Sequence, residues 1–178
     1  KENVPQAWRR GVEMALAWQP VRWLRADGNL TLSLNQIDDY TSYVPIDDYA
    51  GGTHPVHYGR TTMLLSPSLV GMGRVDIFPW KGGSLEGSVK YVGKQFIDNS
   101  MREEMAIPAY WVADASFSQR LNAHLSLSVY VCNLFNRKYY ASGWRWEEYN
   151  EASGKISGGV GVYPQARRNF MLKATYSF

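Results

Sequence analysis

The chain has 178 residues, of which 45% are hydrophobic and 20% are charged, with 19 basic residues against 16 acidic ones. No stretch reaches the roughly 18 to 20 uncharged apolar residues that a transmembrane helix needs, and a formal net charge of +3 is too small and too scattered to indicate nucleic-acid binding. These numbers exclude a helical membrane protein and a disordered chain, and leave a soluble domain and a membrane β-barrel.

A single cysteine, Cys132, excludes an intrachain disulfide, so packing and backbone pairing must hold the fold together. The first ten residues contain neither an initiator Met nor the basic-then-apolar pattern of a signal peptide. We therefore expect a processed or truncated N-terminus.

The strongest pattern along the chain is an alternation of apolar and polar residues, which is typical of β-strands because successive side chains point to opposite faces of a sheet. Between Leu24 and Leu34 the even positions are apolar or small, whereas the odd positions are charged or polar. The last ten residues follow the same rule, with Met171 as the one exception. The alternation predicts seven strands, near residues 9–19, 22–36, 61–79, 84–97, 110–120, 123–135 and 167–178.

The predicted connections alternate in length. Three are short turns and three are long polar loops, at residues 37–60, 98–109 and 136–166. A meander with tight turns at one end and long loops at the other is the layout of a membrane β-barrel. Aromatic residues mark both ends of the predicted strands, as two membrane interfaces require; they include Trp18, Trp23, Trp80, Phe96, Tyr110, Trp111, Tyr139 and Tyr140. We predict an all-β fold of antiparallel, up-and-down transmembrane β-barrel strands.

Two other folds share the alternation. A soluble β-sandwich usually has strands nearer 5 to 6 residues, and its turn lengths have no reason to sort by end. An eight-stranded barrel requires a division of the third predicted strand at Pro67, which puts a turn at the wrong end and leaves strands too short to cross about 25 Å of hydrocarbon. We favour the larger membrane barrel and keep the sandwich as the alternative fold.

Several segments carry a family resemblance. Residues 133–140 (NLFNRKYY) resemble the motif that precedes the last loop of TonB-dependent outer-membrane receptors. Residues 163–170 (YPQARRNF) and the terminal Phe178 are similar to the ending of these receptors, particularly those of Bacteroides type. Residues 91–99 (YVGKQFIDN) and 107–110 (IPAY) are similar too. The resemblance covers nearly the whole chain.

The resemblance implies the C-terminal part of a 22-stranded barrel that surrounds a plug. Because seven strands cannot close an up-and-down barrel with both termini on one side, we expect a fragment or one piece of a larger assembly. The implied location is the outer membrane of a Gram-negative bacterium. The implied partners are outer-membrane lipid and lipopolysaccharide, the remaining strands and plug, the TonB complex through the absent N-terminal part, and the barrel-assembly machinery. The signal for that machinery is expected on the last strand, at Phe170, Leu172, Tyr176 and Phe178.

The implied activity is active import of a scarce nutrient, such as a metal-siderophore complex, haem or cobalamin. The alternative is a small structural or adhesive barrel that works without energy input. A TonB box and a plug sequence upstream of Lys1 distinguish the two.

The long loops hold the residues that we expect to face a ligand. His54 and His57, with Tyr58 beside them, could contact an iron-bearing ligand, although a solvated pair is the simpler interpretation because two histidines supply only part of a metal site. The last loop combines rings with basic residues, which suits a carried ligand, interface anchors or lipopolysaccharide phosphates; its candidates are Arg137, Trp144, Arg145 and Trp146.

Other chemistry is weakly supported. Four acidic pairs in the loops lack the regular oxygen spacing of a calcium loop, so we predict no metal site; they are Asp38-Asp39, Asp47-Asp48, Glu103-Glu104 and Glu147-Glu148. The sequence has no nucleophile elbow, zinc helix motif or paired catalytic carboxylates on one strand face, so we predict neither an enzyme nor a cofactor. Cys132 has no neighbouring His or second Cys to activate it, which predicts a quiet thiol.

Deleting Tyr176 to Phe178 is expected to block insertion into the outer membrane, because the resemblance implies that the assembly machinery recognises the terminal strand. Protease accessibility of the intact protein on whole cells measures its surface display. Normal display of the shortened protein would contradict the expectation.

Overall fold

The computed structural model describes residues 4, 6–47 and 51–178, which form an antiparallel β-sheet in meander order with no α-helix among them. Seven strands follow one another across the sheet in the order β1-β2-β4-β5-β8-β9-β12. They are β1 (Gln6–Val21), β2 (Leu24–Pro45), β4 (Leu69–Ile77), β5 (Gly83–Val92), β8 (Tyr110–Arg120), β9 (Leu125–Cys132) and β12 (Asn169–Tyr176). The predicted all-β meander is confirmed. No helix in the described segments is long and apolar enough to cross a membrane.

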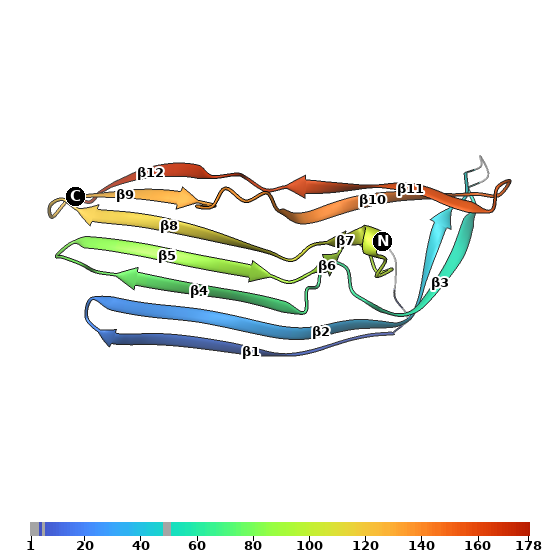
Figure 1. Ribbon diagram of the computed structural model, residues 1–178, viewed down its shortest axis with the longest axis horizontal. Helices are drawn as coiled ribbons and strands as arrows, with labels where there is room; N and C mark the ends of the chain where they lie inside the picture. Colours follow the sequence, from blue (N-terminus) through green and yellow to red (C-terminus); the bar gives the residue numbers. More distant parts are fainter. Residues whose placement is uncertain (1–3, 5, 48–50) are drawn as a thin grey trace.

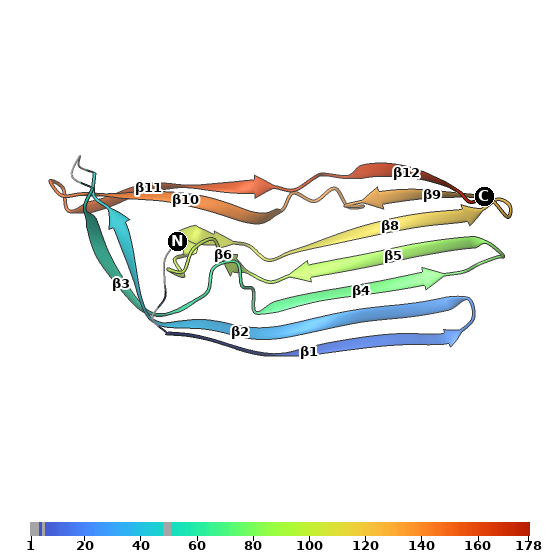
Figure 2. The same ribbon diagram turned by 180° about the vertical axis from the view of Figure 1, so that it is seen from behind.

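The sheet has a turn end and a loop end (Figure 1). The three short connections and the C-terminus lie at the turn end, and the long connections lie at the loop end (Figures 1 and 2). The sheet is open, since within the described residues no strand pairs with the outer edge of β1 or of β12.

The long connections contain more regular structure than the sequence predicts. β3 (Thr53–Thr62) extends the sheet beside β2, and β10 (Tyr140–Asn150) pairs with β11 (Lys155–Pro164) as a separate hairpin. The long connection between β5 and β8 holds two short paired strands, β6 (Gln95–Phe96) and β7 (Ala106–Ile107), and a 3-10 turn, η1 (Glu103–Met105). Two of the segments predicted as loops, 37–60 and 136–166, are therefore largely hairpins.

The third predicted strand, residues 61–79, is divided in the structure. β2 pairs with β4 up to Leu32 and with β3 from Gln36 onward. Residues 63–68 fill the gap between the two, where the Ser33 N–H donates to Ser68 O at 2.9 Å and the Met63 N–H donates to Asn35 O at 3.0 Å. Pro67 cannot donate to a ladder, and this is where the chain changes partner. β4 alone occupies the third position of the meander.

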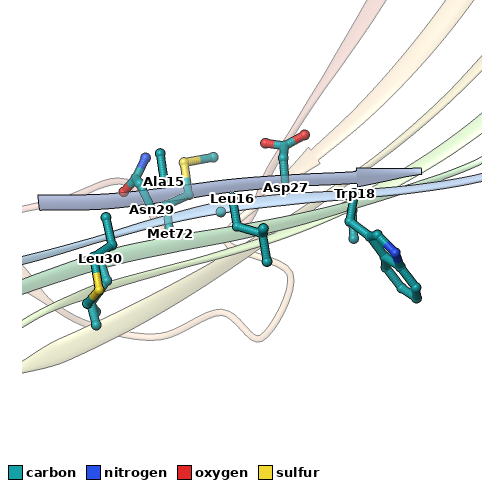
Figure 3. A pocket seen from close by; sticks show the side chains of 10 residues that line it. Ala15, Leu16, Trp18, Asp27, Asn29, Leu30 and Met72 are labelled. Atoms are coloured by element: carbon teal, nitrogen blue, oxygen red, sulfur yellow. The ribbon is translucent and has the colours of Figure 1, made fainter. Parts of the chain in front are cut away.

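The two faces of the sheet differ in chemistry. Figure 3 shows Asp27 and Asn29 on one side of the β1–β2 seam and Leu16, Trp18 and Leu30 on the other. The apolar face holds side chains that are largely exposed, including Leu16 at 73% and Leu172 at 74%. Exposed apolar surface on this scale is typical of a lipid-facing or partner-covered surface rather than of a water-facing sheet.

The polar face carries paired charges on neighbouring strands. Arg74 Nη2 lies 2.8 Å from Asp27 Oδ1, and Arg74 Nε lies 3.8 Å from Asp76 Oδ2. Arg25 Nε lies 3.6 Å from the same oxygen of Asp27. These side chains come together because the register places Asp27 opposite Arg74 and Arg25 opposite Asp76. The predicted alternation therefore sorts charges to one face, where they neutralise one another.

Substituting Leu127 by Arg is expected to impair assembly far more than substituting the adjacent Ser128 by Arg. Leu127 lies on the apolar face, where an Arg at the lipid midplane costs about 2 to 4 kcal/mol. Ser128 lies on the polar face, where its hydroxyl contacts that of Ser118 at 2.8 Å. Expression and heat-modifiability of the intact protein in membranes provide the measurement. Equal assembly of both variants would contradict the assignment of the two faces.

Candidate ligand-facing site

Two hairpins meet above the loop end of the sheet. The hairpin of β2 and β3 comes from one side and that of β10 and β11 from the other (Figures 1 and 2). At their contact the Asp47 N–H donates to Tyr149 O at 2.9 Å, and Ile46 forms an isolated parallel bridge with Tyr149. The rings of His54 and Tyr149 stack with centroids 3.8 Å apart. We call the two hairpins together the arch. One extends from β2 and the other lies between β9 and β12 in the chain, and β4, β5 and β8 separate β2 from β9 in the sheet.

The inner surface of the arch continues the polar face of the sheet. Along β2 the pairing passes from Ile37 opposite Thr61 to Tyr40 opposite Gly59, so β2 contains one extra residue there. Asp39 adopts a positive φ of 59° at this bulge, and Asp is among the residues that tolerate this conformation best. The extra residue shifts the alternation by one. Ile37, on the polar-face parity, is buried, and so are the even-numbered residues after the bulge, Tyr40, Ser42 and Val44.

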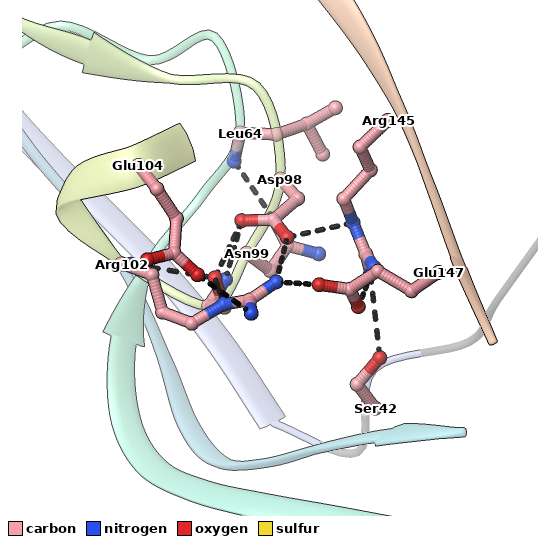
Figure 4. Close-up of polar contacts among 9 residues, drawn as sticks. Ser42, Leu64, Asp98, Asn99, Arg102, Glu104, Arg145 and Glu147 are labelled. Atoms are coloured by element: carbon pink, nitrogen blue, oxygen red, sulfur yellow. Dashed lines mark hydrogen bonds and ion pairs between the residues drawn. The ribbon is translucent and has the colours of Figure 1, made fainter. Parts of the chain in front are cut away.

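A cluster of four charged side chains holds the inner surface together. We call Asp98, Arg102, Arg145 and Glu147 the ion cluster (Figure 4). Arg145 Nε lies 2.7 Å from Asp98 Oδ2, and both Arg102 and Arg145 contact the Glu147 carboxylate. The side chains of Asp98 and Glu147 are only 7% and 4% exposed. The two buried carboxylates are paired with two guanidinium groups, as buried charges require, and the exposed Glu104 also contacts Arg102 at 2.9 Å.

The ion cluster connects three segments that are distant in sequence. The loop after β6 supplies Asp98 and Arg102, and β10 supplies Arg145 and Glu147. Arg145 also donates to Ser42 Oγ on β2 at 3.4 Å. Within the loop, the Ser100 hydroxyl donates to Asp98 Oδ1 at 2.7 Å. Each charge is thus held by groups from at least two elements, so the cluster fixes the arch to the loop beneath it.

Tyrosines lie beside the ion cluster. The Tyr58 ring stacks on Tyr40, with centroids 6.0 Å apart and planes at 24°. Burial raises the pKa of the Tyr58 hydroxyl, with smaller opposing effects of the Arg102 and Glu147 charges. The hydroxyl therefore stays neutral at physiological pH. It is available as a hydrogen-bond donor and acceptor rather than as a phenolate.

Three of the seven residues expected to face a ligand lie on the inner surface of the arch. His54 pairs in register with the buried Val44, Tyr58 stacks on the buried Tyr40, and Arg145 belongs to the ion cluster. These three come from two different hairpins, and the structure brings them to one side of the arch.

The other four candidates lie elsewhere. His57 is exposed and approaches Thr41 Oγ1 at 3.2 Å and Asp39 at 3.5 Å. Trp144 and Trp146 alternate with Arg145 along β10, so they point away from the ion cluster. The Arg137 guanidinium lies over the Trp111 ring at 4.4 Å.

The residues expected to signal assembly lie on or next to β12. Phe170, Leu172 and Tyr176 are exposed on the apolar face. Phe178 follows the strand, and its ring meets that of Tyr176 edge-on at 5.5 Å.

Sequence reasoning missed the partners that make the ion cluster. In the sequence Glu147 stands out only as half of an acidic pair, although its alternation with Arg145 places both on one face of a strand. Asp98 and Arg102 are four residues apart in a loop, and no local pattern indicates that both meet β10.

Three of the acidic pairs contact basic residues. Asp38 accepts from Arg60 at 2.6 Å, Glu103 contacts Lys94 at 2.5 Å, and Glu147 contacts the two arginines of the cluster. Asp48 lies outside the described residues. In the described part of the chain, no three His, Cys, Asp or Glu residues converge as they would around a metal ion.

Comparison with known proteins identifies a family match. Residues 1–134 match the family model described as TonB dependent receptor-like, beta-barrel. Curated proteins gave no match.

Solved structures share the fold. The siderophore receptor PiuA from Acinetobacter baumannii superposes with a TM-score of 0.75 at 13% identity, covering 96% of this chain and 22% of the receptor. The ferric yersiniabactin uptake receptor FyuA from Yersinia pestis superposes with a TM-score of 0.69 at 19% identity, covering 97% of this chain and 24% of the receptor. The ferric-catecholate import receptor Fiu from E. coli K12 superposes with a TM-score of 0.67 at 20% identity, covering 97% of this chain and 21% of the receptor. The chain therefore spans less than a quarter of the length of these receptors.

Substituting Glu147 by Gln is expected to loosen the arch. The change leaves Arg102 and Arg145 with Asp98 as their remaining buried carboxylate, and breaking such a pair costs about 3 kcal/mol or more. Hydrogen exchange of amides 140–164 in the intact protein measures this local opening, with an expected acceleration of roughly a hundredfold.

The adjacent Glu148 provides the matched control. It is exposed and points to the opposite side of β10, so Glu148→Gln is expected to change exchange rates by less than about threefold. Equal exchange in the two variants would show that the ion cluster does not hold the arch.

Proposed function

The chain belongs to the TonB-dependent receptor-like β-barrel family, and on that premise we propose that it forms the C-terminal part of the barrel of an outer-membrane receptor that imports a scarce nutrient. The family match, which spans residues 1–134, is the observation that carries the proposal. The proposed location is the Gram-negative outer membrane, where the apolar face contacts lipid.

The open edges of the sheet support a place within a larger barrel. In hydrocarbon each unpaired backbone group costs several kcal/mol, so the outer edges of β1 and β12 need strand partners. The remaining strands of the same receptor are the proposed partners. The polar face then lines the lumen, and its paired charges at Asp27 and Arg74 face the plug rather than lipid.

The arch supports a role in ligand recognition at the outer mouth. Its inner surface is an extension of the lumen face, and it presents Tyr58, His54 and the ion cluster from elements on both sides. A surface of rings, hydroxyls and paired charges can hydrogen-bond and stack on a bulky polar ligand.

A metal-siderophore complex is the proposed cargo, with haem and cobalamin as the other candidates. Siderophore receptors are prominent among the similar solved structures, which is the reason to place that class first. The TonB complex, reached through the N-terminal part of the receptor, supplies the energy in this proposal. The barrel-assembly machinery is the proposed partner of the terminal strand.

Growth on defined nutrients tests the proposal. Removing the gene is expected to abolish growth on one class of nutrient, supplied as a ferric catecholate, a ferric hydroxamate, haem or cobalamin. The wild-type gene should restore that growth, and should fail to restore it in a strain that lacks TonB.

Undiminished growth on every nutrient would contradict a receptor role. Restoration without TonB would favour the small barrel that works without energy input. As a control, surface display of the restored receptor is measured in both strains, because a receptor that fails to assemble also abolishes growth.

A further inference from the structure

Two arginines and a neighbouring turn come together where the β10–β11 hairpin leaves the sheet. The Arg167 guanidinium donates to Asn136 O at 2.6 Å, and the Arg168 N–H donates to Asn136 Oδ1 at 3.1 Å. Arg137 is the next residue of the same turn. We call Arg137, Arg167 and Arg168 the arginine collar.

The arginine collar is not neutralised within the described part of the chain. Every ion pair found there uses other cations, and the segments 133–142 and 163–169 contain no Asp or Glu. This contrasts with the arginines of the ion cluster, each of which contacts a carboxylate. Three arginines from two neighbouring connections, none of them paired with a carboxylate in the described residues, are suited to bind phosphate.

The arginine collar lies at the border of the apolar face. Arg137 covers the Trp111 ring at 4.4 Å, and the Phe135 ring meets Trp111 edge-on at 5.4 Å. Trp111 pairs in register with Tyr91, which pairs with Gly71 beside Leu30, so this row belongs to the apolar face. The order along the surface is thus apolar strand, aromatic rim and then unpaired cations.

Beyond the arginine collar, the outward side of the hairpin presents flat aromatic rings. Trp144 stands opposite Gly161 and Trp146 opposite Gly159. A Cβ atom at either glycine would lie 2.3 Å or 2.7 Å from the indole Nε1, so the rings lie across the bare backbone. Both indoles are about half exposed, and Tyr163 is exposed on the same side. We call Trp144, Trp146 and Tyr163 the aromatic ladder.

We propose that the arginine collar and the aromatic ladder bind lipopolysaccharide on the outer perimeter of the barrel. A lipopolysaccharide molecule has acyl chains, then phosphates, then sugars, and this order matches the apolar face, the collar and the ladder. The negative face of an aromatic ring attracts the C–H bonds on the flat side of a sugar ring. The arginine collar binds the phosphates, and the rings of the aromatic ladder stack on the sugars that follow the phosphates.

The site is separate from the nutrient site. The aromatic ladder and the ion cluster occupy opposite sides of β10, because Trp144 and Trp146 alternate with Arg145 and Glu147. The proposal therefore does not depend on which nutrient is carried, or on whether TonB drives transport.

Binding of purified lipids to the intact protein in detergent tests the proposal. The probes are lipopolysaccharide with a complete core, a truncated form that keeps the phosphates but lacks the outer sugars, and phosphatidylglycerol. Wild-type protein is expected to bind the complete form roughly tenfold more tightly than the truncated form, and phosphatidylglycerol most weakly.

The two parts of the site have separate variants. Trp144→Ala with Trp146→Ala should reduce binding of the complete form to that of the truncated form and leave the truncated form unchanged. Arg168→Gln removes a charge whose guanidinium makes no hydrogen bond or ion pair within the described residues, and should weaken both forms by roughly tenfold. Tyr43→Ala, on the outward side of the other hairpin, is the aromatic control and should change neither.

Three results would overturn the proposal. Equal binding of phosphatidylglycerol would reduce the collar to a general anion-attracting surface. Equal binding of complete and truncated forms by wild-type protein would remove the sugar contact. Unchanged binding in both the tryptophan and the arginine variants, with normal heat-modifiability, would place any bound lipopolysaccharide elsewhere.

Discussion

The structure depends on one constraint, which is that a strand surrounded by hydrocarbon must pair every backbone N–H and C=O with a neighbouring strand. The meander meets it by placing each of the seven strands next to its neighbour in sequence, so that short turns suffice at one end. Once the backbone is paired in this way, the pleat leaves each side chain only two directions. Leu16 and Leu172 point to the apolar face, and the paired Asp27 and Arg74 point to the polar face.

The same alternation explains what could be predicted from the sequence. The seven strands and their two faces follow from a period of two, which is a local property. The arch could not be predicted, because the shift in alternation at Asp39 depends on one residue in a positive-φ conformation. Residues 136–166 are predicted as a long polar loop, and the glycines at 158, 159 and 161 lie within it. In the structure those glycines lie beneath or beside the rings and chains of the facing strand.

The candidate site was harder to predict than the fold. Its charged residues are linked by contacts such as Arg145 with Asp98, which are 47 residues apart and come from a strand and a loop. No spacing rule relates them. The division of the predicted ligand-facing residues between two sides of the arch has a simpler origin, because Trp144 and Arg145 are neighbours on a strand and must point in opposite directions. Knowing that residues 140–150 form a strand would have separated them.

The central claim is that successive side chains of β9 point alternately to lipid and to the lumen of the barrel. Single-cysteine spin labelling tests this claim most directly. The sole cysteine, Cys132, is first replaced by Ser in the intact protein, and a label is then placed in turn at each residue from Leu125 to Val131. Relaxation by oxygen reports contact with lipid, and relaxation by a water-soluble nickel complex reports contact with water. The account predicts strong oxygen effects at 125, 127, 129 and 131 and strong nickel effects at 126, 128 and 130. A uniform response along the strand, or a period other than two, would contradict it.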